Sequence, residues 1–296
     1  MFKLILLVNN MIAMKKILVP CDFSKPAVNA FRFALRIAKE SKAAVHLLYV
    51  TELPVMPANI LVPVMGFETA YVEDITGKAE AEFKSLAEKY NDAGVKVAFK
   101  IELGSTSERI LDYIRSEEID LVVMGSHGAS GLKEMFIGSN AEKIVRGSLV
   151  PVLVVKNYFS GSITNIVFPN TLETEHQEDL VMKVKALQNL FKAKLHIVYI
   201  NTPLNFASDR VTLARLKAFA ARFMIKDFTI NIYNHQNEEE GINLFAGKVN
   251  AELIAMGTHG RKGIAHLVSG SLAEDVTNHA DSLVWTYTLR GEILKE

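Results

Sequence analysis

Residues 125–145 read GSHGASGLKEMFIGSNAEKIV, with small residues on either side of a loop that holds no cysteine and no paired carboxylates. The stretch follows the apolar run DLVVMG, which is typical of a buried strand that ends at the edge of a parallel sheet. Gly128 allows a tight turn whose amide groups face a ligand. Gly138 and Ser139 precede a helix expected from Asn140, where Ser139 is expected to cap the free amides. Such amides, aided by the helix dipole, predict a site for phosphate groups.

Nearly the same frame occurs again 132 residues later. The stretches MGSHGASGLKEMFIGS (124–139) and MGTHGRKGIAHLVSGS (256–271) share Met-Gly, His-Gly and Gly-Ser at identical offsets. In the second stretch the small residues are Gly257, Gly260, Gly270 and Ser271. Taken singly, such glycines are common in loops, and Gly-Ser is an ordinary helix start. Their repetition in two diverged copies indicates that the frame serves the loop geometry, a ligand, or both.

The chain outside these frames alternates short apolar runs with longer amphipathic segments. In the first copy, KILVP, AVHLLYV, VKVAFKIEL, DLVVMG and VPVLVVK read as strands, and helical patterns separate them. The second copy follows with NIVFP, KLHIVYI, FTINIYN, AELIAMG and SLVWTY. The fold class predicted is α/β, with two tandem doubly wound domains, each a five-stranded, mainly parallel sheet with helices on both faces.

Domain boundaries follow from the same repeat. We expect a first domain at 14–156 and a second, more divergent one at 162–296. Residues 1–13 are interpreted as a leader or an upstream start, because Asn9 and Asn10 interrupt their apolar run and no small-residue cleavage site follows. The apolar segment 52–74 is expected to be a loop that acts as a flap, a lid or a docking surface.

Composition excludes several classes of function. The chain has 33 basic and 33 acidic residues, so it lacks the excess of positive charge that nucleic-acid binding requires. No apolar run reaches the roughly 18 residues of a membrane span. Cys21 is the only cysteine, which excludes an internal disulfide and favours a reducing, cytoplasmic setting. The phosphate loops Gly-x-x-x-x-Gly-Lys-Ser/Thr and Gly-x-Gly-x-x-Gly are both absent, so a different phosphate cradle is implied.

The pattern Gly-x2-Gly-x9-Gly-Ser, in an α/β unit that begins KKILVPCDFS, resembles the universal stress protein family. The resemblance covers 14–156 and, more loosely, 162–289, so the chain is similar to a tandem member. It implies an adenine nucleotide alpha-hydrolase-like fold, with ATP or the related ADP or AMP as ligand, and a cytoplasmic setting. Whether Mg²⁺ accompanies the nucleotide is left open. It also implies that the two halves pair through their last strands as a pseudo-dimer.

The resemblance also implies site residues, carried over by position. Asp22 corresponds to an acidic residue on the adenine side, Pro20 and Cys21 shape its turn, and Val45 lies near the base. A simple Asx turn or helix cap is the other reading of Asp22. The ribose and phosphate contacts fall on Met124, Gly125, His127, Gly128, Gly138, Ser139 and Asn140. In the second half, Gly257, Gly260, Gly270 and Ser271 keep the phosphate frame, whereas Asn170 and Thr171 replace the pair on the base side.

Three functions compete at this stage. The leading one is a binding module for stress response, which holds an adenine nucleotide and changes its interaction with an unidentified protein partner. The alternatives are a slow ATPase, which would lack a Walker lysine, and a ligand-independent interaction protein. No catalytic residue and no metal ligand is assigned, and a homodimer beyond the intramolecular pair stays open.

Overall fold

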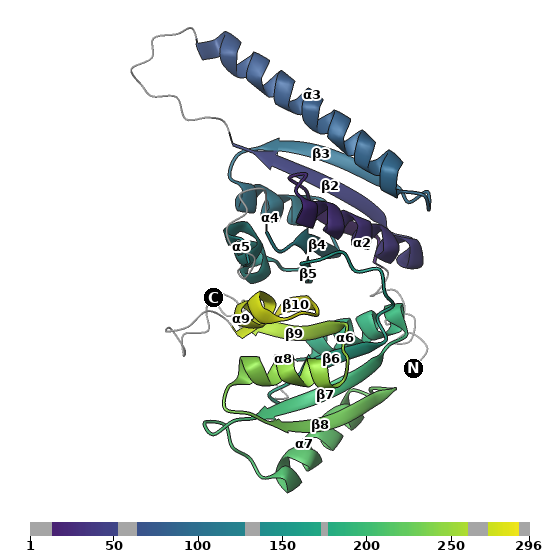
Figure 1. Ribbon diagram of the computed structural model, residues 1–296, viewed down its shortest axis with the longest axis vertical. Coiled ribbons are helices and arrows are strands. Elements are labelled where there is room, and N and C mark those ends of the chain that lie inside the picture. Colours follow the sequence, from purple (N-terminus) through teal and green to yellow (C-terminus); the bar gives the residue numbers. More distant parts are fainter. Residues whose placement is uncertain (1–13, 53–63, 128–136, 173–176, 260–271, 290–296) are drawn as a thin grey trace. The chain divides into compact units, whose positions relative to one another are not determined.

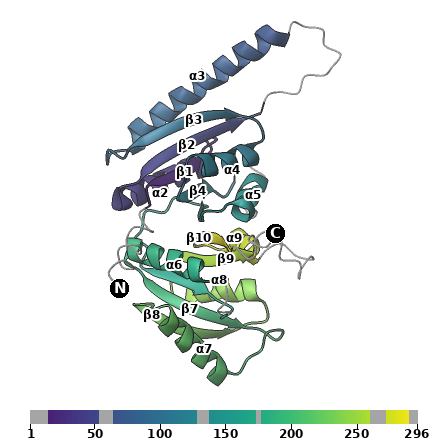
Figure 2. The same ribbon diagram turned by 180° about the vertical axis from the view of Figure 1, so that it is seen from behind.

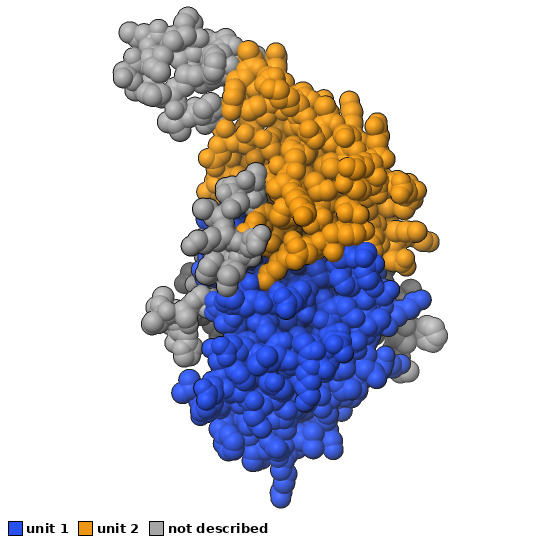
Figure 3. All heavy atoms as spheres, in the orientation of Figure 1, with its two compact units in different colours: residues 1–13, 132–154, 159–296 blue, residues 14–131, 155–158 orange. Residues whose placement is uncertain are grey.

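The computed structural model describes residues 14–52, 64–127, 137–172, 177–259 and 272–289. The leader assigned to 1–13 lies outside the described residues, as do four of the candidate site residues, namely Gly128, Gly260, Gly270 and Ser271. The chain divides into two compact units (Figure 3). Unit 2 contains Met14–Gly131 and Val155–Tyr158, and unit 1 contains Leu132–Val154 and Phe159–Glu296.

Unit 2 is built on a parallel sheet with the strand order β3-β2-β1-β4. Its described elements, in chain order, are β1 (Lys16–Pro20), α2 (Lys25–Ser41), β2 (Ala44–Thr51), α3 (Val64–Tyr90), β3 (Val97–Leu103), α4 (Thr106–Ser116) and β4 (Leu121–Gly125). The side chains of Ile17, Leu18 and Val19 on β1 are all fully buried, which is typical of a strand covered on both faces.

Helices cover both faces of this sheet. On one face, Phe83 of α3 stacks on Phe99 of β3 with ring centroids 5.4 Å apart, and α3 lies alongside β3 in both views (Figure 1, Figure 2). On the other face, the hydroxyl of Tyr113 on α4 lies 2.9 Å from Nδ1 of His46 on β2. Successive residues of a strand point to opposite faces, and His46 is in register with Ala98, the neighbour of Phe99. The doubly wound arrangement is therefore confirmed in unit 2.

In unit 1 the strands follow the order β5-β10-β9-β6-β7-β8. Its described elements are α5 (Ser139–Gly147), β5 (Val152–Val155, of which the first three residues belong to unit 1), β6 (Asn165–Pro169), α6 (Glu178–Phe191), β7 (Lys194–Asn201), α7 (Asp209–Arg222), β8 (Phe228–Asn234), α8 (Glu238–Lys248), β9 (Leu253–His259), α9 (Leu272–His279) and β10 (Leu283–Leu289). Its strand pairs are parallel except for β5 and β10, which pair antiparallel. The mainly parallel α/β fold is thus confirmed in this unit too.

The limits of the compact units differ from the repeat boundary because of β5. Leu153 of β5 is in register with Trp285 of β10, so the last strand of the first repeat joins the sheet of the second. Helix α5, which precedes β5 in the chain, also belongs to unit 1. Its Arg146 forms an ion pair with Glu274 of α9 at 2.6 Å. The two final strands therefore pair, as the family resemblance implied.

In each repeat, a carboxylate side chain accepts hydrogen bonds from the backbone at the start of the first strand. Asp120, just before β4, accepts hydrogen bonds from the backbone N–H groups of Lys15 and Lys16, at 2.7 and 3.0 Å. Glu252, just before β9, does the same for Thr164 and Asn165, at 2.9 and 2.8 Å. The repeat is therefore visible in the hydrogen bonds as well as in the glycine frame.

One expectation about the first repeat is wrong. The segment 52–74 was expected to be a loop, but α3 begins at Val64, so its last eleven residues are helical. Residues 53–63 lie outside the described residues. No helix in the described part of the chain is both long enough and apolar enough to cross a membrane.

Candidate functional site

The carboxyl end of β1 is the first part of the candidate site. Pro20 ends the strand, and the N–H of Cys21 donates to the carbonyl of Leu48 on β2 at 2.9 Å. The next residue, Asp22, accepts a hydrogen bond from the N–H of Ser24 through Oδ1 at 3.1 Å. Ser24 in turn is the N-cap of α2. The turn predicted from the proline is therefore present, and it leads directly into the helix.

Asp22 forms an Asx turn, the structural alternative to a ligand contact. Its bond to Ser24 is an Asx-type contact, which lets the intervening Phe23 adopt a left-handed conformation with φ of 63°. The second repeat has the same feature, because Leu172, in the position of Phe23, has φ of 62°. A bulky residue in this conformation is uncommon, so the turn is fixed by its surroundings in both repeats.

Cys21 is a buried structural residue. Its side chain is 2% exposed, and burial raises the pKa of its thiol to about 12. A thiol with such a pKa stays protonated at neutral pH and is a poor nucleophile. The structure thus fits the role of a turn-shaping residue for Cys21.

Met124 and Gly125 end β4, beside the start of α2. Both are buried, and a Cβ built on Gly125 would lie 2.8 Å from the carbonyl carbon of Pro26 and 2.9 Å from the nitrogen of Ala27. Since those are backbone atoms of the first helical turn, no larger residue fits without moving the helix. The glycine is therefore required for helix packing. The family resemblance implied only a ligand contact for Gly125.

Ser126 and His127 follow β4 at the same edge. The N–H of Ser126 donates to the carbonyl of Val155 at 3.2 Å, and its Oγ lies 2.8 Å from Nδ1 of His127. The other ring nitrogen of His127, Nε2, is buried and has no hydrogen-bond partner among the residues that the structure describes. A buried polar atom without a partner is costly, so Nε2 is a candidate contact for a bound group.

Val45 is not at this edge of the sheet. It is in register with Ile17 near the amino end of β1, and its side chain is fully buried. Pro20 is instead in register with Leu48, so the partly buried Val50 is a residue of β2 that reaches the carboxyl edge. The sequence shows that β2 is long, but its register against β1 decides which valine reaches the edge.

The start of α5 carries the Gly138-Ser139 part of the predicted glycine frame, and it belongs to unit 1. Gly138 is the N-cap, with φ of −65° and ψ of 148°, and as a glycine it has no side chain to accept a hydrogen bond from the first turn. Ser139 is the first helical residue, so the helix begins one residue earlier than expected and Ser139 does not cap it. Asn140 follows it, and both side chains are exposed. The N–H of Ile137 is held by Oδ1 of Asn278 at 2.6 Å, which ties this segment to α9.

At the equivalent edge of the second repeat, the described residues include buried apolar and amide side chains. Asn170 is buried, and it accepts from the N–H of Leu172 at 2.7 Å and donates to Oε1 of Gln177 at 2.7 Å. Gly257 lies within β9, against Leu180 of α6, whose Cδ2 would lie 2.9 Å from an added Cβ. Leu172 and Leu180 are both buried. Thr171, in the position of Asp22, is exposed to solvent.

The described residues combine hydrogen-bonding groups without an evident nucleophile. Free helix amides and the buried His127 Nε2 suit an anionic or polar ligand, and the Asp22 carboxylate suits an amino or hydroxyl group. Within the described ranges, no three His, Cys, Asp or Glu side chains are grouped so that they could hold a metal ion.

Comparisons with known proteins agree with the fold. The model of the universal stress protein family matches residues 14–156 and 163–287. Two universal stress proteins of Methanocaldococcus jannaschii are 30% and 32% identical to the chain, each over 48% of it and over 82% and 94% of their own lengths. Among solved structures, a universal stress protein from Archaeoglobus fulgidus matches 94% of this chain and 99% of its own, with a TM-score of 0.74 at 20% identity. A protein from Pseudomonas aeruginosa matches 95% of both chains with a TM-score of 0.67.

Proposed function

The chain belongs to the universal stress protein family, with the family's domain present twice, and on this premise we propose that its first repeat binds ATP or the related ADP or AMP. Occupancy of this site changes the interaction of the chain with a protein partner in the stress response. The setting is the cytoplasm, and the binding module comprises the domains 14–156 and 162–296.

The observation that carries the proposal is the uncapped start of α5. Gly138 has no side chain, so the N-cap residue itself leaves the amides that follow it uncovered. The amino end of a helix carries the equivalent of about half a positive charge, which favours a phosphate oxygen. The glycine frame that places this helix start is repeated in the chain, which supports a role beyond an ordinary loop.

Two groups at the carboxyl edge of unit 2 support the same ligand class. The ring nitrogen Nε2 of His127 is buried without a partner among the described residues, so a ligand oxygen or hydroxyl would satisfy it. The Asp22 carboxylate is a charged acceptor, which suits an amino or hydroxyl group of a nucleoside. Both follow strands of a parallel sheet, at the edge where ligands of such folds bind.

We assign the nucleotide to the first repeat because the described residues at the corresponding place in the second repeat are engaged with one another. Asn170 is engaged with Gln177, and Leu180 covers Gly257. Apolar side chains at this edge offer no hydrogen bonds to a ribose or a phosphate. One nucleotide per chain is the stoichiometry expected.

Calorimetric titration of the full chain with ATP, ADP and AMP tests the proposal. We expect one site per chain, and we expect Gly138→Val to abolish binding, because the valine side chain would cover the helix amides. A φ of −65° is open to any residue, so this substitution adds bulk without backbone strain.

Gly77→Val is the matched control. Gly77 lies in α3, and nothing approaches within 4 Å of the place where its Cβ would be. This variant should bind like the parent chain. Absence of binding at millimolar nucleotide in the parent chain would overturn the proposal and favour a ligand-independent interaction protein.

A further inference from the structure

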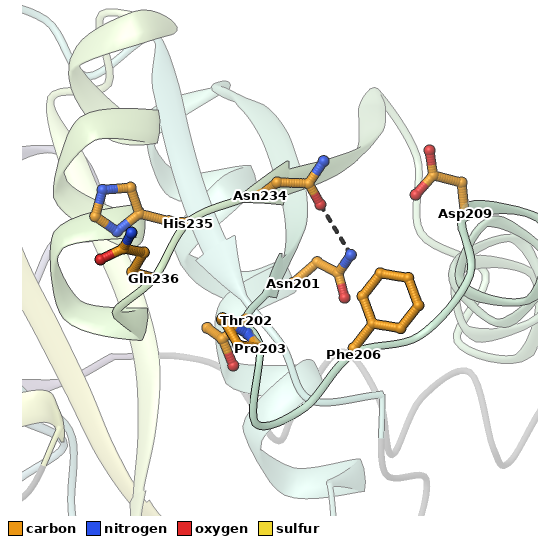
Figure 4. Close-up of a pocket in the computed structure, with 8 residues that line it drawn as sticks. All are labelled: Asn201, Thr202, Pro203, Phe206, Asp209, Asn234, His235 and Gln236. Atoms are coloured by element: carbon orange, nitrogen blue, oxygen red, sulfur yellow. Dashed lines mark hydrogen bonds between the residues drawn. The ribbon is translucent and has the colours of Figure 1, made fainter.

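A hollow of about 780 Å³ lies in unit 1, at the carboxyl ends of β7 and β8 (Figure 4). Its lining combines three side-chain amides with a carboxylate, an imidazole, a hydroxyl and two apolar rings, from Asn201, Thr202, Pro203, Phe206, Asp209, Asn234, His235 and Gln236. It shares no residue with the candidate nucleotide site. In a parallel sheet this edge is where ligands bind.

Two paired asparagines form the floor of the hollow. Asn201 and Asn234 are the last residues of β7 and β8 and are in register. Nδ2 of Asn201 donates to Oδ1 of Asn234 at 2.8 Å, and Oδ1 of Asn201 accepts from the N–H of Ala207 at 3.0 Å. These bonds fix both amide planes and fold the connection after β7 back over the strand ends. The floor is therefore ordered without a ligand, which lowers the entropy cost of binding.

Several polar groups of the lining are left for a ligand. Nδ2 of Asn234 points away from Asn201 (Figure 4). The side chains of Asp209 and Gln236 have no hydrogen-bond or ion-pair partner among the described residues. Together these groups offer amide donors, an amide acceptor and a carboxylate.

An aromatic ring stands beside these groups. Phe206 is 75% exposed, and its ring lies next to Asn201, on the same side of the hollow as Asp209 (Figure 4). Together with Pro203 it gives the hollow an apolar side next to the polar groups, which suits a ligand with an apolar face and a polar edge.

The charge of the lining argues for a neutral ligand. It contains no lysine or arginine to pair with a phosphate or carboxylate ligand. Its single carboxylate, Asp209, lies in the first turn of α7, where it also interacts favourably with the positive end of the helix. The helix dipole offsets this negative charge, so a cation gains little here.

We propose that this hollow binds a small neutral polyhydroxylated compound, a sugar of one or two rings. Hydroxyl groups both donate and accept, as do the amides of Asn234 and Gln236, and the Asp209 carboxylate can accept from two neighbouring hydroxyls. The C–H face of a sugar ring fits against the Phe206 ring. The volume lies within the range of about 300–1,000 Å³ common for small-molecule sites.

Saturation-transfer NMR on the full chain, with D-glucose and maltose as probes and cyclohexanol as a hydroxyl-poor control, tests the proposal. We expect transfer to the sugar ring protons at millimolar concentration and none to cyclohexanol. Equal transfer to cyclohexanol, or none to either sugar, would overturn it. Adding AMP should leave the sugar signal unchanged; competition by AMP would likewise overturn a separate sugar site.

Two pairs of variants locate the binding. Phe206→Ala should remove the ring contact, whereas Leu204→Ala, in the same connection but 95% exposed and outside the lining, should change nothing. Asp209→Asn should weaken binding by about tenfold or more, the usual effect of losing a charged hydrogen bond. Asp179→Asn, in the first turn of α6, controls for the loss of a helix-dipole contact. If each variant binds like its control, the sugar does not occupy this hollow. Because none of these residues belongs to the nucleotide site, failure here leaves the proposed function untouched.

Discussion

Asp22 combines a structural contact with a proposed ligand contact, and substitution can separate the two. Asparagine keeps an Oδ1 that can accept from the N–H of Ser24, but it has no charge. We therefore expect Asp22→Asn to change the unfolding free energy by less than about 0.5 kcal/mol and to weaken AMP binding by about tenfold. Asp22→Ala should also destabilise the fold, by about 1 kcal/mol, because it removes the turn bond. Calorimetric titration and urea unfolding measure the two effects.

If Asp22→Asn bound AMP with unchanged affinity, the Asp22 charge would have no role in nucleotide binding, and Asp22 would serve only the turn. Asp92→Asn, in the turn that follows α3, is a suitable control for a loss of negative charge in the same unit. It should alter neither the affinity nor the stability.

Gly125 and Gly257 occupy the same place in the two repeats but meet different atoms. An added Cβ at Gly125 collides with the backbone of α2, whereas at Gly257 the nearest atoms are the ends of the flexible Leu180 and Leu289 side chains. We expect Gly125→Ala to cost about 1–3 kcal/mol, the range for overpacking a rigid site. Gly257→Ala should cost less, since leucine methyl groups can shift. Urea unfolding compares them, and equal losses would contradict this account.

At the scale of the element, β2 and β7 each carry a histidine at the same position. Burial lowers the pKa of both His46 and His196 from the usual value of 6.5. Nδ1 of His196 lies 2.8 Å from the Thr229 hydroxyl, and its Nε2 lies 3.0 Å from Oδ1 of Asn165. The neutral ring suits these surroundings in the folded chain.

This burial predicts a pH dependence with a definite sign. Below about pH 6.5 the unfolded chain binds protons at these histidines that the folded chain does not, so stability falls as the pH drops through that value. Urea unfolding between pH 7.5 and 5.5 should show this decline, and the double substitution His46→Gln, His196→Gln should make it shallower. His235→Gln, an exchange at a histidine whose Nδ1 binds a local backbone group, is the control. A decline of the same slope in the double variant would exclude these histidines as its cause.

The sequence was sufficient for the order of strands and helices because buried parallel strands are continuous apolar runs, such as Ile17–Val19. It was insufficient where a boundary depends on contacts. The stretch 52–63 reads ELPVMPANILVP, and its apolar composition continues into α3, so composition alone does not mark the helix start at Val64. The placement of Val45 failed for a related reason, because strand register is set by pairing and not by composition. The glycine frame is visible in the sequence because it is repeated. The contact between Gly125 and the backbone of Pro26 depends on how α2 packs against β4, which the sequence pattern does not specify.

At the scale of the whole molecule, the pairing of β5 with β10 ties the last strand of the first repeat to the second. Both edges would otherwise present unpaired backbone groups, which promote aggregation. Trp285 of β10 is 2% exposed, lies opposite Leu153, and stacks near Tyr287 with ring centroids 6.4 Å apart. The first repeat therefore owes part of its stability to residues more than a hundred positions away.

A substitution in β10 of the second repeat should accordingly reduce the stability of β5 in the first. We expect Trp285→Ala to cost about 3–5 kcal/mol, as for other large-to-small aromatic changes in a core. Amides of β5 (Val152–Val155) should lose protection from hydrogen exchange together with those of β10. Phe219→Ala is the matched control, since Phe219 is also buried but packs against Phe168 and Phe223. That variant should lose protection in α7 and β6 before β5 is affected. If β5 keeps its protection in Trp285→Ala while β10 loses it, the two strands do not form one cooperative pair.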